Sequence, residues 1–303
     1  MNPIPCIWDA PSRAIAANPP PSRTFLVLRS VLEENKDLLS QGVSCKTILS
    51  VLPIAYNRSE LIMKFLVLLL GLAAVVLAEE EDTELPRLAM QNPDLFGGDM
   101  AGIDGPEDAE RNAIPGQFYR WPNARVPYII DYSLGGYDRL MNQAFQAYAS
   151  STCVRFVPRT NERDYVYIFP GQGCYSHVGR TGGQQPLSLG NGCLYIGTVI
   201  HELGHALGFY HEQNRSDRDD HLIIYIQNVV RGMESNFAKL APSQNILYTG
   251  FDLNSVMIYG NNAFSHNGYA TMVARNGQRL TEPYEKNGMT QSDITRVNKM
   301  YNC

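Results

Sequence analysis

From residue 112 onward, the spacing of apolar residues predicts a domain that mixes strands and helices. The segments ARVPYIID (124–131) and RDYVYIF (163–169) are rich in Val, Ile and Tyr, which is typical of strands. Between them, after the turn signal GGYD, four apolar residues recur at helical spacing: Leu140, Ala144, Phe145 and Tyr148. The pattern therefore predicts a strand, a helix and a strand, in that order.

A glycine-rich stretch, residues 179–193, contains the extended piece QPLSL. Pro186 has no amide N–H to donate to a neighbouring strand, so we predict an edge strand here. The free backbone groups of an edge strand can bind an extended peptide. The sequence thus predicts that a substrate lies along residues 186–189.

Two further helices are expected in this part of the chain. One runs over residues 195–207 and ends at Gly208. The other lies near the C-terminus, where Ser292 can cap a helix. Its apolar residues lie on or near one face: Ile294, Val297, Met300 and Tyr301. No internal repeat interrupts the pattern.

The apolar run in MKFLVLLLGLAAVVLA, residues 63–78, predicts a secretory signal peptide. A Met and a Lys precede the run, which ends in a small residue at the expected cut. The alternatives are a buried core helix or an uncleaved anchor, although the run is short for a membrane span. Since 62 residues precede this peptide, we expect synthesis to begin at Met63. Residues 1–62 are then a doubtful extension that is not translated or is disordered.

Charge divides the remaining chain into two parts. Residues 79–111 hold 2 basic and 11 acidic residues, whereas residues 112–303 hold 16 basic and 14 acidic residues. The acidic run EEEDTE is typical of a solvated, flexible stretch. The net charge of −5 argues against a nucleic-acid partner.

Cysteine usage agrees with secretion. Of six cysteines, two lie in residues 1–62 and four lie after residue 112, which predicts two disulfides in an oxidising compartment. Three pairings of the four are open from sequence alone. Free thiols or a cysteine zinc site are the alternatives, and the absence of a CxxC pair disfavours the zinc site.

Three of the six histidines crowd into TVIHELGHALGFYHEQNR, residues 198–215. On a helix, His201 and His205 lie on one face and can bind one metal, while Glu202 reaches the space beside it. Gly208 allows the chain to turn back so that His211 supplies a third ligand. Three histidines with one open position suit catalytic zinc. A structural zinc site would have no use for Glu202 and would be closed by a fourth ligand.

At these residues the sequence resembles the astacin family of metzincin zinc endopeptidases. The family signature stands here as HELGHALGFYHEQNRSDRD, from His201 to Asp219, and the Met-turn stands as SVMIY, residues 255–259. The segment LFGGD (95–99) fits the FxGD motif of the family's prosegment. The resemblance covers residues 86–303. It departs from many members at Ile258 and Tyr210, neither of which is expected to bind the metal.

The resemblance implies an α+β, two-lobed metzincin domain over residues 112–303. Its parts would be a twisted sheet, an active-site helix, the Met-turn and a C-terminal helix. One Zn²⁺ per chain would be bound by the three histidines, with Tyr259 as a fifth, detachable ligand. Glu202 would be the general base, Met257 an apolar floor under the metal, and Tyr259 a donor to the reacting oxygen. The implied disulfides are Cys153–Cys303 and Cys174–Cys193.

The resemblance also implies a zymogen. Residues 79–111 would be a propeptide in which Asp99 occupies the zinc until cleavage after Arg111. The new N-terminus at Asn112 would then be buried and paired, through water, with Glu212. The competing interpretation is that Glu212 is an ordinary surface carboxylate.

The predicted function is a secreted, extracellular zinc endopeptidase. Its partners would be protein or peptide substrates and its own propeptide, without nucleic acid and without a membrane anchor in the mature form. A catalytically silent zinc fold that acts as a binding protein is one alternative, and a membrane-anchored sheddase is another. Arg275 is a candidate for the pocket that follows the scissile bond. The sequon at Asn214 lies within the zinc signature, so we expect poor glycan occupancy.

Overall fold

The computed structural model describes residues 84–103 and 117–303. All described residues belong to one compact unit of the chain. The extension, the signal peptide and the cut between Arg111 and Asn112 lie outside the described residues. Within the described ranges, no helix is both long and apolar enough to cross a membrane.

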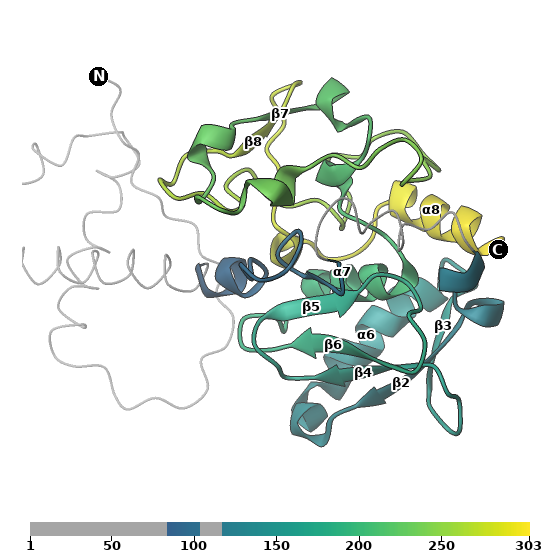
Figure 1. The fold of residues 1–303 in the computed structure, drawn as a ribbon. Coiled ribbons are helices and arrows are strands. Elements are labelled where there is room, and N and C mark those ends of the chain that lie inside the picture. Colours follow the sequence, from purple (N-terminus) through teal and green to yellow (C-terminus); the bar gives the residue numbers. More distant parts are fainter. Residues whose placement is uncertain (1–83, 104–116) are drawn as a thin grey trace, which may run out of the picture. The chain divides into compact units, whose positions relative to one another are not determined.

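A six-stranded sheet is the largest β element of the described chain, in the order β1-β5-β6-β4-β2-β3 (Figure 1). Strand β5 pairs antiparallel with β6, and the other neighbours are parallel. The strands are β1 (Met100–Ala101), β2 (Arg125–Ile130), β3 (Arg155–Pro158), β4 (Tyr165–Phe169), β5 (Cys174–His177) and β6 (Gln184–Leu189). Strands β2 and β4 and the helix between them confirm the sequence prediction.

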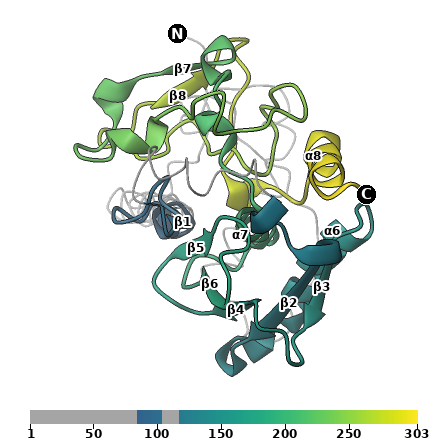
Figure 2. The same ribbon diagram turned by 45° about the vertical axis from the view of Figure 1, so that its right-hand side comes forward.

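Two helices, α6 (Asp138–Ala149) and α7 (Ile196–Leu207), pack on one face of this sheet (Figures 1 and 2). Alternate strand residues such as Val166 and Ile168 are fully buried and share one apolar core with Tyr148 and Leu203 from the helices. The strands bury every second side chain and α6 buries one face, and these two buried surfaces form one interface. The fold is α+β, with a mixed sheet and helices.

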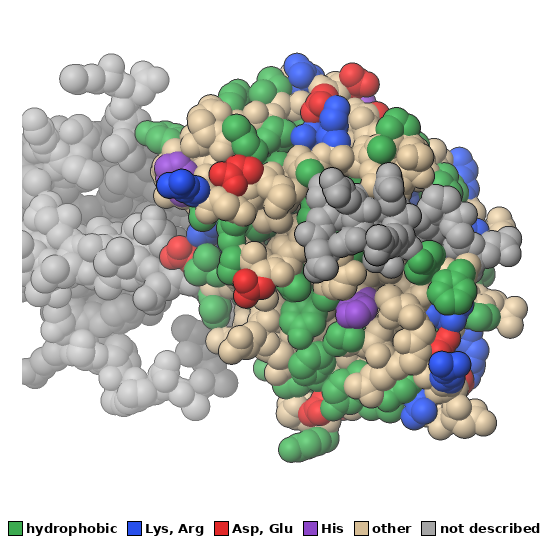
Figure 3. Space-filling view, viewed as in Figure 1, with side chains coloured by type: hydrophobic (Ala, Val, Ile, Leu, Met, Phe, Trp, Pro, Cys, Tyr) green, Lys and Arg blue, Asp and Glu red, His purple; other side chains and the backbone are tan. Residues whose placement is uncertain are grey.

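The chain beyond α7 builds a second part around a two-stranded antiparallel sheet, β7 (Leu222–Ile224) and β8 (Met272–Ala274). It ends in α8 (Gln291–Tyr301). Figures 1 and 2 show α7 between the two sheets. On the described part of the face in Figure 3, Lys and Arg side chains lie scattered among acidic ones.

The two disulfides have the pairing that the resemblance implied. Cys153 pairs with Cys303, which connects the end of the chain to the segment before β3. Cys174 pairs with Cys193, which connects β5 to the loop before α7. The first bond thus ties the C-terminus to the sheet, and the second ties the sheet to the segment that leads into the histidine motif.

The prediction that residues 186–189 form an edge strand is wrong. Strand β6 lies inside the sheet, between β4 and β5. Pro186 is compatible with this position because β5 pairs only with the stretch from Leu187 to Leu189, so β5 requires no hydrogen bond from the proline nitrogen. On this side the sheet ends in the short strand β1, residues 100–101, which pairs with β5.

The predicted cap of the C-terminal helix is also corrected, by two residues. The helix begins after Thr290, whose hydroxyl accepts a hydrogen bond from the Asp293 amide, and the Asp293 carboxylate accepts one from the Thr290 amide. This reciprocal pair is a capping box. Ser292 lies inside the first turn and donates to Thr249 instead.

Replacing Thr290 with Ala should therefore destabilise the protein by about 1 kcal/mol, because the amide of Asp293 loses its acceptor. Ser292→Ala is the matched control, since its hydroxyl satisfies no helix N–H. Thermal unfolding of both variants measures the difference. Equal melting temperatures, or a larger loss in Ser292→Ala, would show that the cap is misassigned.

Candidate metal centre

Helix α7 carries the first two histidines and the glutamate of the motif, and it is buried from Gly197 to Leu207. Its end is fixed at Gly208, whose φ of 114° is the left-handed conformation that glycine adopts without strain. The chain then turns back and brings His211 against the helix. The sequence prediction of a helix, a glycine stop and a returning third histidine is confirmed in geometry.

Three imidazole nitrogens converge at the centre of the site. The Nε2 atoms of His201 and His205 are 3.0 Å apart, and each lies 3.2 Å from Nε2 of His211. The Nδ1 atom of His201 donates to the Val256 carbonyl at 2.7 Å. Nδ1 of His205 donates to the Phe209 carbonyl at the same distance. Their Nε2 atoms therefore carry lone pairs, and mutual hydrogen bonds cannot explain their approach.

This spacing fits a shared metal ion. Tetrahedral bonds of about 2.05 Å from zinc to nitrogen would place ligand nitrogens about 3.3 Å apart. All three rings are fully buried, and burial lowers the pKa of His201 to about 3 and also lowers the pKa of His211, so these two rings are neutral ligands. The donor set of three imidazoles is one that zinc commonly binds.

A carboxylate completes the set from the N-terminal side. Asp99 is fully buried, with Oδ2 3.0 Å from His201 Nε2 and Oδ1 3.1 Å from His211 Nε2. Burial alone would raise its pKa, but the charges of His211 and His205 and the hydrogen bond with His201 hold that pKa well below its usual value. A buried anion is stable only beside positive charge, and a metal ion bound between this carboxylate and the imidazoles would supply it.

Glycines allow this carboxylate to approach. A Cβ on Gly97 would lie 2.8 Å from the His211 ring, and the residue has a φ of +67°. A Cβ on Gly98 would lie 2.6 Å from the Met90 carbonyl, at a φ of +90°. The Gly97 amide also donates to Asn236 Oδ1 at 2.9 Å. Larger residues at either position would force the segment away from the site.

Glu202 follows the first histidine and is also fully buried. Neither of its carboxylate oxygens has a hydrogen-bond partner among the described residues. Burial, with the nearby charge of Asp99, raises its pKa well above the usual value. A buried carboxylate without donors next to a metal-type donor set is poised to accept a proton from a small molecule in that space.

The turn formed by residues 255–259 lies against the histidines. Tyr259 is buried, and its hydroxyl contacts both the Asp99 carboxylate and the Met90 carbonyl. Met257 is buried too, and its Sδ lies 2.6 Å from where a Cβ on Gly204 would be. Gly204 therefore admits this side chain to the helix surface. No local pattern predicts that glycine, because its role depends on a distant residue of the chain.

Glu212 is not a surface carboxylate. It is 3% exposed and bonded to two guanidinium groups, Arg296 at 2.6 and 2.7 Å and Arg215 at 3.0 Å. Arg296 and Arg215 thus pair with the Glu212 carboxylate in the uncleaved chain. Pairing with the terminus of Asn112 lies outside the described residues. Sequence reasoning missed Arg296, which comes from α8 and carries no local signal.

Two other sequence candidates are placed by the structure. Asn214 is fully buried, and its Nδ2, the atom a glycan would modify, donates to the carbonyls of Asn236 and Ala238. Arg275 follows β8, and its Nε donates to the Asp219 carbonyl at 2.7 Å. The buried, hydrogen-bonded amide of Asn214 supports poor glycan occupancy. The contact of Arg275 with Asp219 does not test its pocket role, which stays a prediction.

Comparison with known proteins gives a consistent result. The family model Astacin, which describes a peptidase family, matches residues 114–302. Astacin-like metalloprotease toxin 1 of Loxosceles intermedia is 43% identical over 214 residues, which cover 69% of this chain and 81% of the toxin. Zinc metalloproteinase nas-15 of Caenorhabditis elegans is 41% identical over 235 residues, covering 71% of this chain but 41% of the relative.

One solved structure is similar over most of its length. High choriolytic enzyme 1, a hatching enzyme zinc-protease from Oryzias latipes, shares 40% sequence identity with this chain. The superposition has a TM-score of 0.56 and covers 61% of this chain and 93% of the hatching enzyme.

The geometry predicts that the purified protein contains one zinc ion, and that His205→Ala contains much less than one. Loss of one of three imidazoles leaves a site with two nitrogens, which holds zinc far more weakly. His266→Ala is the control, because His266 lies outside the cluster of potential ligands. Atomic absorption after dialysis measures the content. A full zinc complement in His205→Ala would contradict the assignment of this ligand.

Proposed function

The chain belongs to the astacin family of zinc metalloendopeptidases, and from this premise we propose that it is a secreted endopeptidase, made as a zymogen, in which Glu202 is the general base. One observation carries the proposal. Three convergent imidazoles lie beside buried Glu202, which has no hydrogen-bond partner among the described residues, and Asp99 faces the same point. His201, His205 and His211 would hold a single zinc ion.

Zinc, when bound there, lowers the pKa of a coordinated water to about 7 and polarises the scissile carbonyl. Glu202 would accept a proton from the attacking water and pass it to the leaving amine. Its buried position without competing donors supports this role, because no described side chain holds the carboxylate in another direction. The same carboxylate would thus act in the attack by water and in the departure of the amine.

Tyr259 and Met257 have separate proposed roles in the site. Once Asp99 has left, the Tyr259 hydroxyl loses its carboxylate acceptor and can donate to the oxyanion of the tetrahedral intermediate. We propose that Tyr259 also acts as the fifth, detachable ligand. Met257, packed on Gly204, would form the apolar floor of a Met-turn.

Latency would come from Asp99. Its carboxylate lies where a reacting water must sit, within 3.0–3.4 Å of all three ligand nitrogens. The pairing of residues 100–101 with β5 adds a second obstruction, because this strand edge is the one an extended substrate would use. We therefore move the proposed substrate strand from residues 186–189 to β5.

Activation would follow a cut between Arg111 and Asn112, after export directed by residues 63–78. The disulfides support an oxidising, extracellular compartment. Protein or peptide chains would be the substrates, and the propeptide would be an intramolecular partner. The cut would leave residues 112–303 as the mature enzyme.

Replacing Glu202 with Ala should leave zinc bound and lower kcat by about 10²- to 10⁴-fold, because the proton acceptor is gone. Hydrolysis of a quenched fluorescent peptide measures the rate, and o-phenanthroline should abolish it in the parent enzyme. Glu234→Ala, an exposed carboxylate, is the control. Near-normal turnover in zinc-loaded Glu202→Ala would remove the general-base role.

Replacing Asp99 with Ala should raise the peptidase activity of the uncleaved precursor or speed its self-processing, because the obstructing carboxylate is lost. Asp94→Ala is a matched control within the same segment, since Asp94 is exposed. Activity is measured together with gel analysis of the chain length. If the uncleaved Asp99→Ala precursor stays as latent as the parent, Asp99 is not the inhibitory group.

A further inference from the structure

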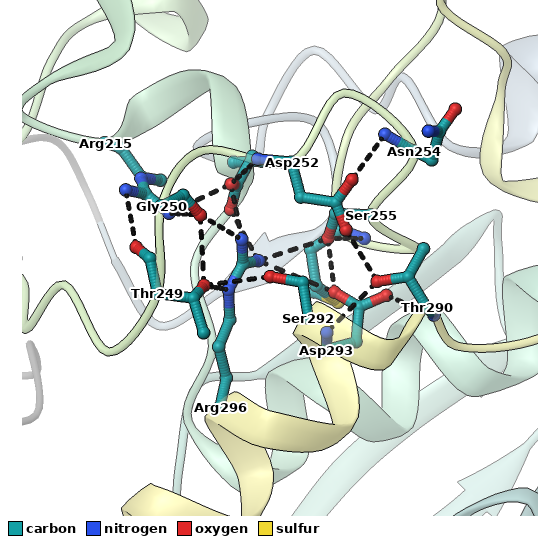
Figure 4. Close-up of polar contacts among 12 residues, drawn as sticks. Arg215, Thr249, Gly250, Asp252, Asn254, Ser255, Thr290, Ser292, Asp293 and Arg296 are labelled. Atoms are coloured by element: carbon teal, nitrogen blue, oxygen red, sulfur yellow. Dashed lines mark hydrogen bonds and ion pairs between the residues drawn. The ribbon is translucent and has the colours of Figure 1, made fainter.

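We propose that Asp293 and Arg296 of α8, called here the α8 pair, are positioning residues that fix two of the three zinc-binding histidines. The inference rests on the proposed zinc site and adds residues that make no contact with the metal position. The two side chains lie one helical turn apart on α8, with Ser255 beside them (Figure 4). Asp293 also contacts the Val256 amide, and Arg296 contacts Glu212. Each acts on a different histidine.

Arg296 acts on His211 through Glu212. Its Nη1 and Nη2 donate to the two carboxylate oxygens of Glu212 at 2.7 and 2.6 Å, a bidentate pair. The Glu212 amide donates to the Met257 carbonyl at 2.8 Å. Glu212 is thus held at its backbone and at both side-chain oxygens, so the preceding residue, His211, has a fixed position.

Asp293 acts on His201 through the backbone of Val256. Its Oδ2 accepts from the Val256 amide at 2.9 Å, and its Oδ1 accepts from the Ser255 hydroxyl at 2.6 Å. The Val256 carbonyl in turn accepts the Nδ1 hydrogen of His201 at 2.7 Å. This bond sets the tautomer and the ring direction of a ligand, as outer groups do in metal sites.

The burial of the pair favours a geometric role over a stabilising one. Asp293 is 5% exposed and Arg296 is 7% exposed. Buried ion pairs contribute little net stability, because removing both charges from water opposes their attraction. They do restrict geometry, since an arginine fork matches a carboxylate in one plane. Because the contacts exist while the prosegment is still attached, the histidines are positioned before activation.

The test compares zinc affinity with thermal stability in the full-length precursor. Arg296→Gln should weaken zinc binding about 10- to 100-fold, as the loss of outer-shell partners typically does. Arg296→Lys keeps a charge but cannot bond both oxygens in a fork, so it should weaken binding less. Val297→Ala, a buried apolar neighbour on α8, is the control that lowers stability without touching the pair.

Dissociation constants come from competition with a chromophoric chelator at a temperature where every variant is folded, and melting curves come from the same samples. Weakened zinc binding in the Arg296 variants, beside normal binding in Val297→Ala, supports the inference. Parent-like affinity in the folded Arg296 variants would overturn it, and so would equal weakening in Val297→Ala. A parent protein that binds no zinc would instead overturn the proposed function. If Arg296→Gln does not fold, Arg296→Lys decides the question.

Discussion

The structure depends on an electrostatic constraint at its centre, where a fully buried carboxylate faces three fully buried imidazoles. Asp99 cannot remain ionised there without a cation, and the imidazole nitrogens cannot approach to 3.0–3.2 Å without a common partner. One metal ion satisfies both conditions. The surrounding features, from the left-handed glycines to the buried helix, bring these four side chains to one point.

Local patterns in the sequence are sufficient to predict those parts of the site that lie on a single helix. The spacing of His201 and His205 follows from helical periodicity, and Gly208 marks the end of α7 because only a left-handed residue can follow there. The disulfide pairing came from the family resemblance. Contacts between distant segments carry no local signal: Gly204 is required by Met257, and Glu212 is neutralised by Arg296.

The wrong edge-strand prediction has the same cause, because it depends on contacts between segments that are distant along the chain. Pro186 indicates an edge because a proline removes a donor, yet only the order of strands decides whether that donor is needed. The pairing of Glu212 with a new terminus at Asn112 stays a prediction, and the structure adds two arginine partners, which lie 3 and 84 residues away along the chain. The substrate edge that we propose is thus β5, which pairs with residues 100–101 in this structure.

The most direct test of this account is an X-ray structure of the secreted precursor with anomalous data collected at the zinc edge. We expect one anomalous peak, about 2.0–2.2 Å from the three Nε2 atoms and from an oxygen of Asp99. A peak coordinated by the histidines with Asp99 turned away would contradict the proposed latency. The absence of any peak between His201, His205 and His211 in catalytically competent protein would contradict the metal centre itself.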